Sequence, residues 1–403
     1  MRLLYLVLIA VAVLTVGAAA ADTNEQPVIR YGDLIHPVFG PAGMVASQNR
    51  LASAVGADIL SAGGNAVDAA VAVSFALAVT LPRAGNIGGG GFMLIHDAAG
   101  GETTSVDYRE MAPPGASRDM YLDADGNVDN TRARFSHLSS GVPGTVAGLW
   151  EAHQRYGRLE WRQLVEPAIP LAREGVEVSY DMASVLSLRQ ARLCANAAAC
   201  RYFFKADGSP YEPGETIVQA DLAATLEAIA ENGRDGFYKG KVARLIAADM
   251  KRNGGLIDED ALARYEPVWR EPVSGTYRGY EIVTMAPPSS GGVHVLQMLN
   301  ILEAFDIGSM GAGSADSVHL LAEAMRLAFA DRSKHLGDPD FYPVPVEWLT
   351  SKEYGAELAK TIDLSHARSS DDVLPGTAPA PESPDTTHIS IIDADGNVVS
   401  KTY

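Results

Sequence analysis

The stretch Asp385-Thr386-Thr387-His388-Ile389-Ser390-Ile391-Ile392 decides how this chain of 403 residues is interpreted. It follows a segment rich in Ser, Asp and Pro (367–385), which we expect to be an exposed loop. A threonine at the start of a strand, directly after such a loop, indicates a nucleophile held inside a precursor. Cleavage of the Asp385–Thr386 bond would place a free α-amine beside the hydroxyl of Thr386, which makes a nucleophile with its own base.

The chemistry of that amine suits general-base catalysis. A free α-amine has a pKa of about 7.7–8, so a useful fraction is unprotonated near neutral pH. The competing interpretation is that two β-branched threonines simply begin a strand.

Composition describes an ordinary globular protein and excludes some partners. The hydrophobic fraction is 47%, the charged fraction is 20%, and the formal net charge is −18. Such an acidic chain is not expected to bind nucleic acid or anionic membranes.

The N-terminus is typical of a secretory signal peptide. Met1-Arg2 precede an apolar run at 3–16 and small residues up to Ala21. We assign 1–21 to the signal, cleaved after Ala20 or Ala21. The alternative is an uncleaved anchor, although the run is short for a bilayer-spanning helix. The prediction is an exported protein, periplasmic or extracellular, with no membrane span after the signal is removed.

Two cysteines, Cys194 and Cys200, lie six positions apart. In an oxidising compartment this spacing favours a local disulfide, with two free buried thiols as the alternative. No His/Cys pattern accompanies them, so we expect no zinc site.

The hydrophobic pattern predicts a mixed α/β chain without internal repeats. Asn65 should cap a nearly all-apolar helix at 66–79, with Asp68 as its reciprocal partner. The last segments predict a β-hairpin with strands at 386–392 and 398–403 around a turn at Asp395-Gly396. Further helices are predicted at 143–156, 161–174, 181–194, 221–232, 240–253, 293–305 and 315–330, and strands at 92–95, 105–108 and 280–285.

Four features are candidates for binding, and each has a structural alternative. The glycines at 88–91 could approach an anion closely or form a packed turn. The Ser-Ser-Gly-Gly at 289–292 could bind a carboxylate at a helix N-terminus or cap the helix. Arg109, after a strand, could clamp a carboxylate with two parallel bonds or pair with Glu110. His388 should face away from Thr387, as a catalytic helper or as a hydrogen-bonded core histidine.

Several segments in order resemble the γ-glutamyltransferases (γ-glutamyl transpeptidases), which are N-terminal-nucleophile hydrolases. The matching segments are 64–70, 85–93, 107–113, 141–148, 287–292, 337–341 and 386–388. The resemblance implies an αββα sandwich, incomplete at its C-terminus, and no metal or organic cofactor. It also implies that the precursor cleaves itself before Thr386, and that Thr386 then attacks the γ-amide of glutathione or a related compound. Arg109 would hold the α-carboxylate, and water, amino acids or peptides would accept the γ-glutamyl group.

By this resemblance, residues 22–385 correspond to the large subunit and 386–403 to the start of a small subunit that should continue further. Two other hypotheses remain open. One is a related acylase that cleaves glutaryl side chains from β-lactam compounds, and the other is an inert exported fragment.

Overall fold

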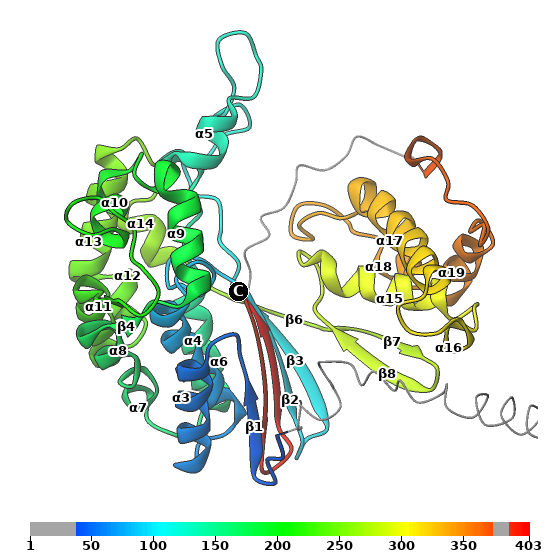
Figure 1. Ribbon diagram of the computed structural model, residues 1–403, viewed down its shortest axis with the longest axis horizontal. Helices are drawn as coiled ribbons and strands as arrows, with labels where there is room; N and C mark the ends of the chain where they lie inside the picture. Colours follow the sequence, from blue (N-terminus) through cyan, green and yellow to red (C-terminus); the bar gives the residue numbers. More distant parts are fainter. Residues whose placement is uncertain (1–37, 374–386) are drawn as a thin grey trace, which may run out of the picture. The chain divides into compact units, whose positions relative to one another are not determined.

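A six-stranded antiparallel sheet organises the computed structural model, which describes residues 38–373 and 387–403. All strands and helices belong to one compact unit, Ala42–Tyr403 (Figure 1). The strand order is β1 (Gly43–Ala46), β9 (His388–Asp393), β10 (Val398–Thr402), β2 (Phe92–Asp97), β3 (Glu102–Asp107) and β6 (Val268–Arg270). The predicted hairpin β9–β10 therefore lies between two strands from the N-terminal part of the chain, and both of its edges are paired.

Helices from the first two thirds of the unit lie on one side of this sheet (Figure 1). They are α3 (Arg50–Ser61), α4 (Ala66–Thr80), α5 (Asn130–Phe135), α6 (Thr145–Tyr156), α7 (Trp161–Val165), α8 (Ala168–Glu174), α9 (Tyr180–Leu193), α10 (Ala197–Phe203), α11 (Ala220–Asn232), α12 (Asp235–Tyr238), α13 (Gly240–Arg252) and α14 (Glu259–Arg264). Two short strands among them, β4 (Val176–Glu177) and β5 (Thr216–Ile217), pair with each other.

Helix α4 is the centre of the core, as its apolar composition predicts. All of its residues except Thr80 are buried, and it packs against both strands of the β9–β10 hairpin. The Asn65 side chain accepts hydrogen bonds from the backbone N–H groups of Val67 and Asp68, while Asp68 accepts one from Asn65 N–H. The predicted capping box is confirmed, and it satisfies donors that would otherwise be orphaned in the core.

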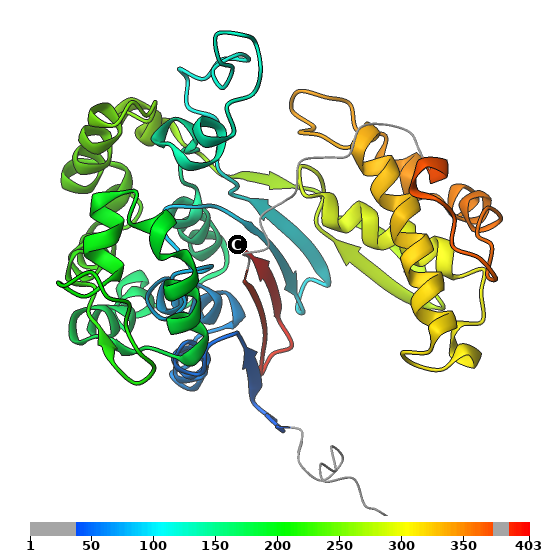
Figure 2. The same ribbon diagram turned by 45° about the horizontal axis from the view of Figure 1, so that its top comes forward.

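A second, two-stranded sheet and its helices lie between β6 and β9 along the chain (Figure 2). Strands β7 (Val273–Tyr277) and β8 (Tyr280–Thr284) form a hairpin that contacts α15 (Ser290–Leu302). Helix α15 packs in turn on α17 (Ala315–His335) and α19 (Lys352–Ala359), with α16 (Ile307–Met310) and α18 (Val346–Leu349) between them in sequence. One group of helices (α3–α14) accompanies the six-stranded sheet, and a second group (α15–α19) accompanies the β7–β8 sheet. This combination of two sheets and two helical groups agrees with the predicted αββα sandwich.

Some predicted boundaries are wrong for identifiable reasons. The helix predicted at 161–174 is divided into α7 and α8, because Pro167 cannot continue the hydrogen-bonding pattern of α7. Strand β9 begins at His388, two residues after the predicted start, and Asp385 and Thr386 lie outside the described residues. Strands β1, β6 and β7 were not predicted, because their short segments carry little periodicity.

No helix within 38–373 and 387–403 combines the length and apolarity needed to cross a bilayer. The proposed signal, residues 1–21, lies outside the described residues.

Lys401 is an unexpected member of the sheet face that packs on α4. Its side chain has no exposed surface, its Nζ donates to Ser74 Oγ at 2.8 Å, and the same atom lies 3.0 Å from the ring centroid of Tyr403. Within the described part of the chain it makes no ion pair. Burial lowers the pKa of the Lys401 ammonium well below its usual value.

We predict that Lys401→Met stabilises the protein at pH 7 by about 1–2 kcal/mol. In the unfolded chain the lysine keeps its proton up to about pH 10.4, whereas in the folded state it loses the proton more readily. Below that pH, the burial of Lys401 therefore lowers the free energy of unfolding. The stability of the parent should therefore rise with pH toward that of the variant. Denaturant unfolding at pH 7, 8 and 9 measures this, with Lys251→Met on the exposed surface of α13 as the control for net charge. If the difference in the free energy of unfolding between Lys401→Met and the parent does not become smaller as the pH rises, the prediction is wrong.

Candidate functional site

The site is built around the open end of the β9–β10 hairpin. Thr387 N–H donates to Tyr403 O at 2.9 Å and Tyr403 N–H donates to Thr387 O at 3.1 Å, which extends the hairpin by one residue pair. The side chain of Thr387 faces the core, and Thr387 is 1% exposed. The chain therefore enters β9 at the end of the hairpin where Thr402 and Tyr403 lie.

A cavity of about 790 Å³ opens at this end of the hairpin. It is lined by Arg83, Ala84, Asn86, Gly90, Gly91, Phe92, Leu94, Arg109, Glu110, Met285, Ser289, Ser290, Gly291, Ser400, Thr402 and Tyr403. A second cavity of about 450 Å³ shares Arg109, Glu110 and Ser290 with the first and is bordered by Arg270 and Arg332. Segments that the sequence singles out separately, at 88–91, 109 and 289–292, thus meet in one place.

Arg109 presents a guanidinium group suited to binding an anion. It is exposed, lies two residues after β3, and its Cζ is 6.0 Å from the centroid of the Phe92 ring. Among the described residues it forms no ion pair, so the alternative pairing with Glu110 is absent. Desolvation and the nearby charge of Arg109 lower the pKa of Arg332, which shows that two guanidinium groups share this region. The guanidinium of Arg109 can bind a carboxylate through two parallel bonds, beside acidic side chains such as Glu110 that line the same cavities.

Gly90 and Gly91 lie in close contact with neighbouring backbone segments. A Cβ on Gly90 would lie 2.5 Å from Tyr108 O, and one on Gly91 would lie 2.5 Å from Thr402 O. Gly89 O accepts hydrogen bonds from the N–H groups of Gly144 and Thr145 at the start of α6. The segment therefore brings β3, β10 and α6 together, which agrees with the packed-turn interpretation.

The serines at 289–290 do not cap α15 as the structural alternative expects. Ser289 occupies the N-cap position without a side-chain hydrogen bond, and the helix begins at Ser290, three residues before its predicted start. Ser290 Oγ accepts a hydrogen bond from Arg332 Nε at 3.1 Å. The helix N-terminus thus faces the cavities with its serine hydroxyl bound by an arginine.

His388 lies on the face of the sheet opposite to Thr387, as predicted, but the alternative of a core histidine is wrong. It is exposed, and its Nδ1 and Nε2 are hydrogen-bonded to Thr402 Oγ1 at 2.8 Å and Ser390 Oγ at 3.1 Å. Partial desolvation lowers its pKa. The strand alternation places it on the open side, away from α4.

Cys194 and Cys200 lie away from the two cavities. Their Sγ atoms are 2.06 Å apart in a disulfide that links the end of α9 to α10. Within the described ranges, no three His, Cys, Asp or Glu residues are grouped as metal ligands.

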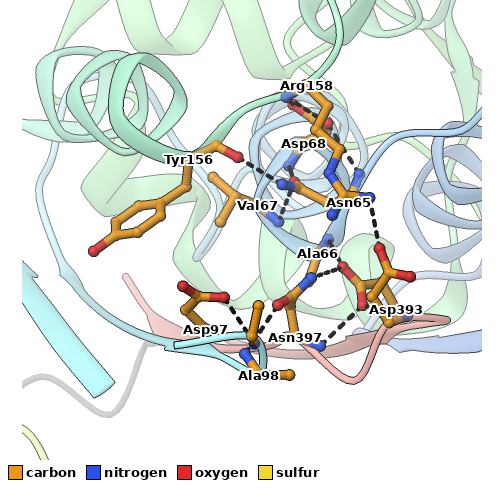
Figure 3. A network of polar contacts seen from close by, with 12 residues as sticks. Asn65, Ala66, Val67, Asp68, Asp97, Ala98, Tyr156, Arg158, Asp393 and Asn397 are labelled. Carbon is orange, nitrogen blue, oxygen red and sulfur yellow. Dashed lines mark hydrogen bonds and ion pairs between the residues drawn. The ribbon is translucent and has the colours of Figure 1, made fainter. Parts of the chain in front are cut away.

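The turn of the hairpin is fixed on the N-terminus of α4 (Figure 3). Asp393 Oδ2 accepts hydrogen bonds from Ala66 N–H at 3.0 Å and from Asn397 Nδ2 at 2.7 Å, and its Oδ1 accepts from the N–H groups of Asp395 and Asn397. Burial alone would raise the pKa of Asp393, but these hydrogen bonds lower it overall. A carboxylate at a helix N-terminus is also favoured by the helix dipole.

Three residues that surround Arg109 are absent from the sequence-based candidates: Tyr265, Arg270 and Arg332. Each lies 156 or more positions from Arg109 along the chain. No local pattern relates them to it, so only folding brings them together.

The fold and this cavity define an α/β protein of the N-terminal-nucleophile hydrolase class. The family model for gamma-glutamyltranspeptidase matches residues 52–403. The chain is 50% identical to the glutathione hydrolase proenzyme of Escherichia coli K12, over 98% of this chain and 69% of the relative. It is 44% identical to the acylase ACY 1 proenzyme of Pseudomonas sp. SE83, over 93% of this chain and 68% of that protein. The crystal structure of Helicobacter pylori gamma-glutamyltranspeptidase matches with a TM-score of 0.81 and 45% identity, covering 87% of this chain and 99% of that one.

The chain therefore belongs to the gamma-glutamyltranspeptidase family, and the predicted family and fold class are confirmed. It spans 63 to 69% of the length of the first three curated relatives.

We predict that Asp393→Ala lowers the free energy of unfolding by about 2–3 kcal/mol, because it leaves the buried N–H of Ala66 and three part-buried donors without their acceptor. Asp395→Ala is the matched control. It removes an exposed ion pair with Arg158 Nη1 at 2.7 Å and should cost less than about 1 kcal/mol. Denaturant unfolding of both variants measures the difference. Equal losses would show that Asp393 does not anchor the turn.

Proposed function

We propose that this chain is the precursor of a γ-glutamyl hydrolase/transferase that acts on glutathione and related γ-glutamyl amides. The observation that carries the proposal is the position of Arg109. Its exposed guanidinium, unpaired among the described residues, borders the cavity at the end of the hairpin where Thr387, the first described residue of that segment, pairs with Tyr403. A fork of parallel N–H donors there matches the α-carboxylate of a γ-glutamyl group.

Thr386 is the proposed nucleophile. Cleavage of the Asp385–Thr386 bond frees its α-amine, which accepts the hydroxyl proton as Oγ1 attacks the γ-carbonyl carbon. The amide nitrogen of the donor leaves with that proton, and the γ-glutamyl group remains as an ester on Oγ1. Water, an amino acid or a peptide then attacks the ester carbonyl carbon and gives up a proton to the α-amine. The α-amine passes this proton to Oγ1 as the ester bond breaks, which restores the hydroxyl.

The same proposal defines the parts of the chain. Residues 1–21 direct export to the periplasm or the exterior and are removed. Residues 22–385 form the large subunit, and Thr386 becomes the first residue of the small subunit. The curated relatives named proenzymes support this division. After cleavage the hairpin stays in the sheet, because β1 and β2 pair with it on both sides.

Thr386→Ala should abolish both self-cleavage and turnover in the full-length protein, since the variant lacks the attacking oxygen. A denaturing gel and N-terminal sequencing of the smaller subunit measure cleavage, and release of p-nitroaniline from γ-glutamyl-p-nitroanilide measures turnover. Thr387→Val is the control. It keeps the shape of a buried side chain whose hydroxyl has no partner among the described residues, so processing should continue. Normal cleavage in Thr386→Ala would refute the role of Thr386.

Arg109→Lys should raise KM for γ-glutamyl-p-nitroanilide by about 10- to 100-fold, because a single ammonium cannot reproduce two parallel bonds to a carboxylate. Steady-state kinetics of the processed enzyme measure the change. An unaltered KM would exclude the proposed clamp.

The acylase activity is the second candidate, because the chain is 44% identical to an acylase proenzyme. Glutaryl-p-nitroanilide has the distal carboxylate but lacks the α-amine of the γ-glutamyl compound. The proposed function predicts a higher kcat/KM for γ-glutamyl-p-nitroanilide, and a preference for the glutaryl compound would favour the acylase.

A further inference from the structure

Arg109 is held by its main chain on both sides. Its N–H donates to Asp107 Oδ1 at 3.0 Å, and its carbonyl oxygen accepts from the Tyr265 hydroxyl at 2.8 Å. The side chain itself is exposed. Two buried groups thus fix the backbone of a residue whose side chain adds little to the core.

The carboxylate of Asp107 is itself fixed by Arg270. Asp107 Oδ2 accepts from Arg270 Nε at 2.8 Å, and the side chains are 7% and 13% exposed respectively. The other nitrogens of Arg270 bind both oxygens of Asp340 at 3.1 and 2.9 Å. Because both Asp107 oxygens are in use, the carboxylate cannot rotate without breaking a charge-assisted bond.

The hydroxyl of Tyr265 is equally constrained. Tyr265 is 2% exposed, its ring stacks on Tyr238 at 5.9 Å with an interplanar angle of 12°, and its carbonyl accepts from Arg234 Nη2. Burial raises the pKa of Tyr265, so the hydroxyl keeps its proton and remains a donor to the Arg109 carbonyl.

We propose that Tyr265 and Asp107 are positioning residues for substrate binding, because they hold the Arg109 backbone where the guanidinium meets the carboxylate of the donor. The inference rests on the proposed function of Arg109. A long side chain recognises a planar carboxylate through two bonds only if its base is fixed, since small displacements at a binding group strongly reduce its effect. If the two bonds only stabilised the fold, their loss would change KM equally for donors with and without the carboxylate.

Tyr265→Phe tests the proposal in the processed full-length enzyme. It removes only the hydroxyl, so the fold should persist. We expect KM for γ-glutamyl-p-nitroanilide to rise about three- to tenfold with kcat within twofold of the parent. For 4-aminobutyryl-p-nitroanilide, which lacks the carboxylate, kcat/KM should not change.

Tyr238→Phe is the matched control. Tyr238 is also a buried tyrosine, but its hydroxyl donates to Pro143 O at 2.7 Å and makes no bond to Arg109. It should lower the melting temperature about as much as Tyr265→Phe and leave KM for both donors unchanged. The proposal is overturned if Tyr265→Phe leaves KM for the γ-glutamyl donor unchanged or changes kcat/KM equally for both donors. It is also overturned if Tyr238→Phe raises KM for the γ-glutamyl donor as much as Tyr265→Phe does.

Arg109→Met separates this proposal from the proposed function. If Arg109→Met does not raise KM for the γ-glutamyl donor, the clamp and its positioning both fail. If it does and Tyr265→Phe does not, only the positioning fails. Should Tyr265→Phe not fold, Arg270→Lys loosens Asp107 by removing its bond to Arg270 Nε, together with the bonds of Arg270 to Asp340. A two- to fourfold rise of KM is then expected, and an unchanged KM overturns the proposal.

Discussion

The insertion of the β9–β10 hairpin between β1 and β2 is the constraint on which the rest of the structure depends. Every strand of the hairpin has partners on both sides, so its register is set by two neighbours as well as by its own turn. The apolar face of the hairpin rests on α4, and Asp393 attaches its turn to the N-terminus of that helix. A chain break before the hairpin would therefore leave its position unchanged.

This arrangement brings the segment that leads from the proposed nucleophile, late in the chain, to the same cavity as the proposed binding group Arg109 from an early segment. The open end of the hairpin, the glycine segment and the end of β3 converge because Gly90 and Gly91 allow backbone contacts that any side chain would block. Arg109 emerges from that convergence with its backbone fixed and its guanidinium exposed. The exposed guanidinium of Arg109 makes no ion pair among the described residues, which leaves it able to bind an anionic group in a chain whose net charge is −18.

Local patterns predicted much of the fold. The capping box of Asn65 and Asp68, the apolar helix it begins and the turn of the final hairpin were all predicted correctly, because each depends on neighbours within a few residues. The break at Pro167 was missed although proline is a known helix breaker, since the apolar periodicity continued across it. His388 was assigned to the correct side of its strand by alternation, but alternation alone does not show whether that side is covered.

The candidate site also has a part that the sequence predicts and a part that only the tertiary structure shows. The sequence by itself determined the identity of the proposed nucleophile, the arginine after a strand and the glycine and serine segments, because these residue types carry their chemistry wherever they lie. Only the tertiary structure decided that these segments share one cavity, that Lys401 is buried against α4, and that Tyr265 and Arg270 support Arg109. The physical reason is that such contacts join residues more than 150 positions apart, and their energies depend on packing and burial that no local pattern records.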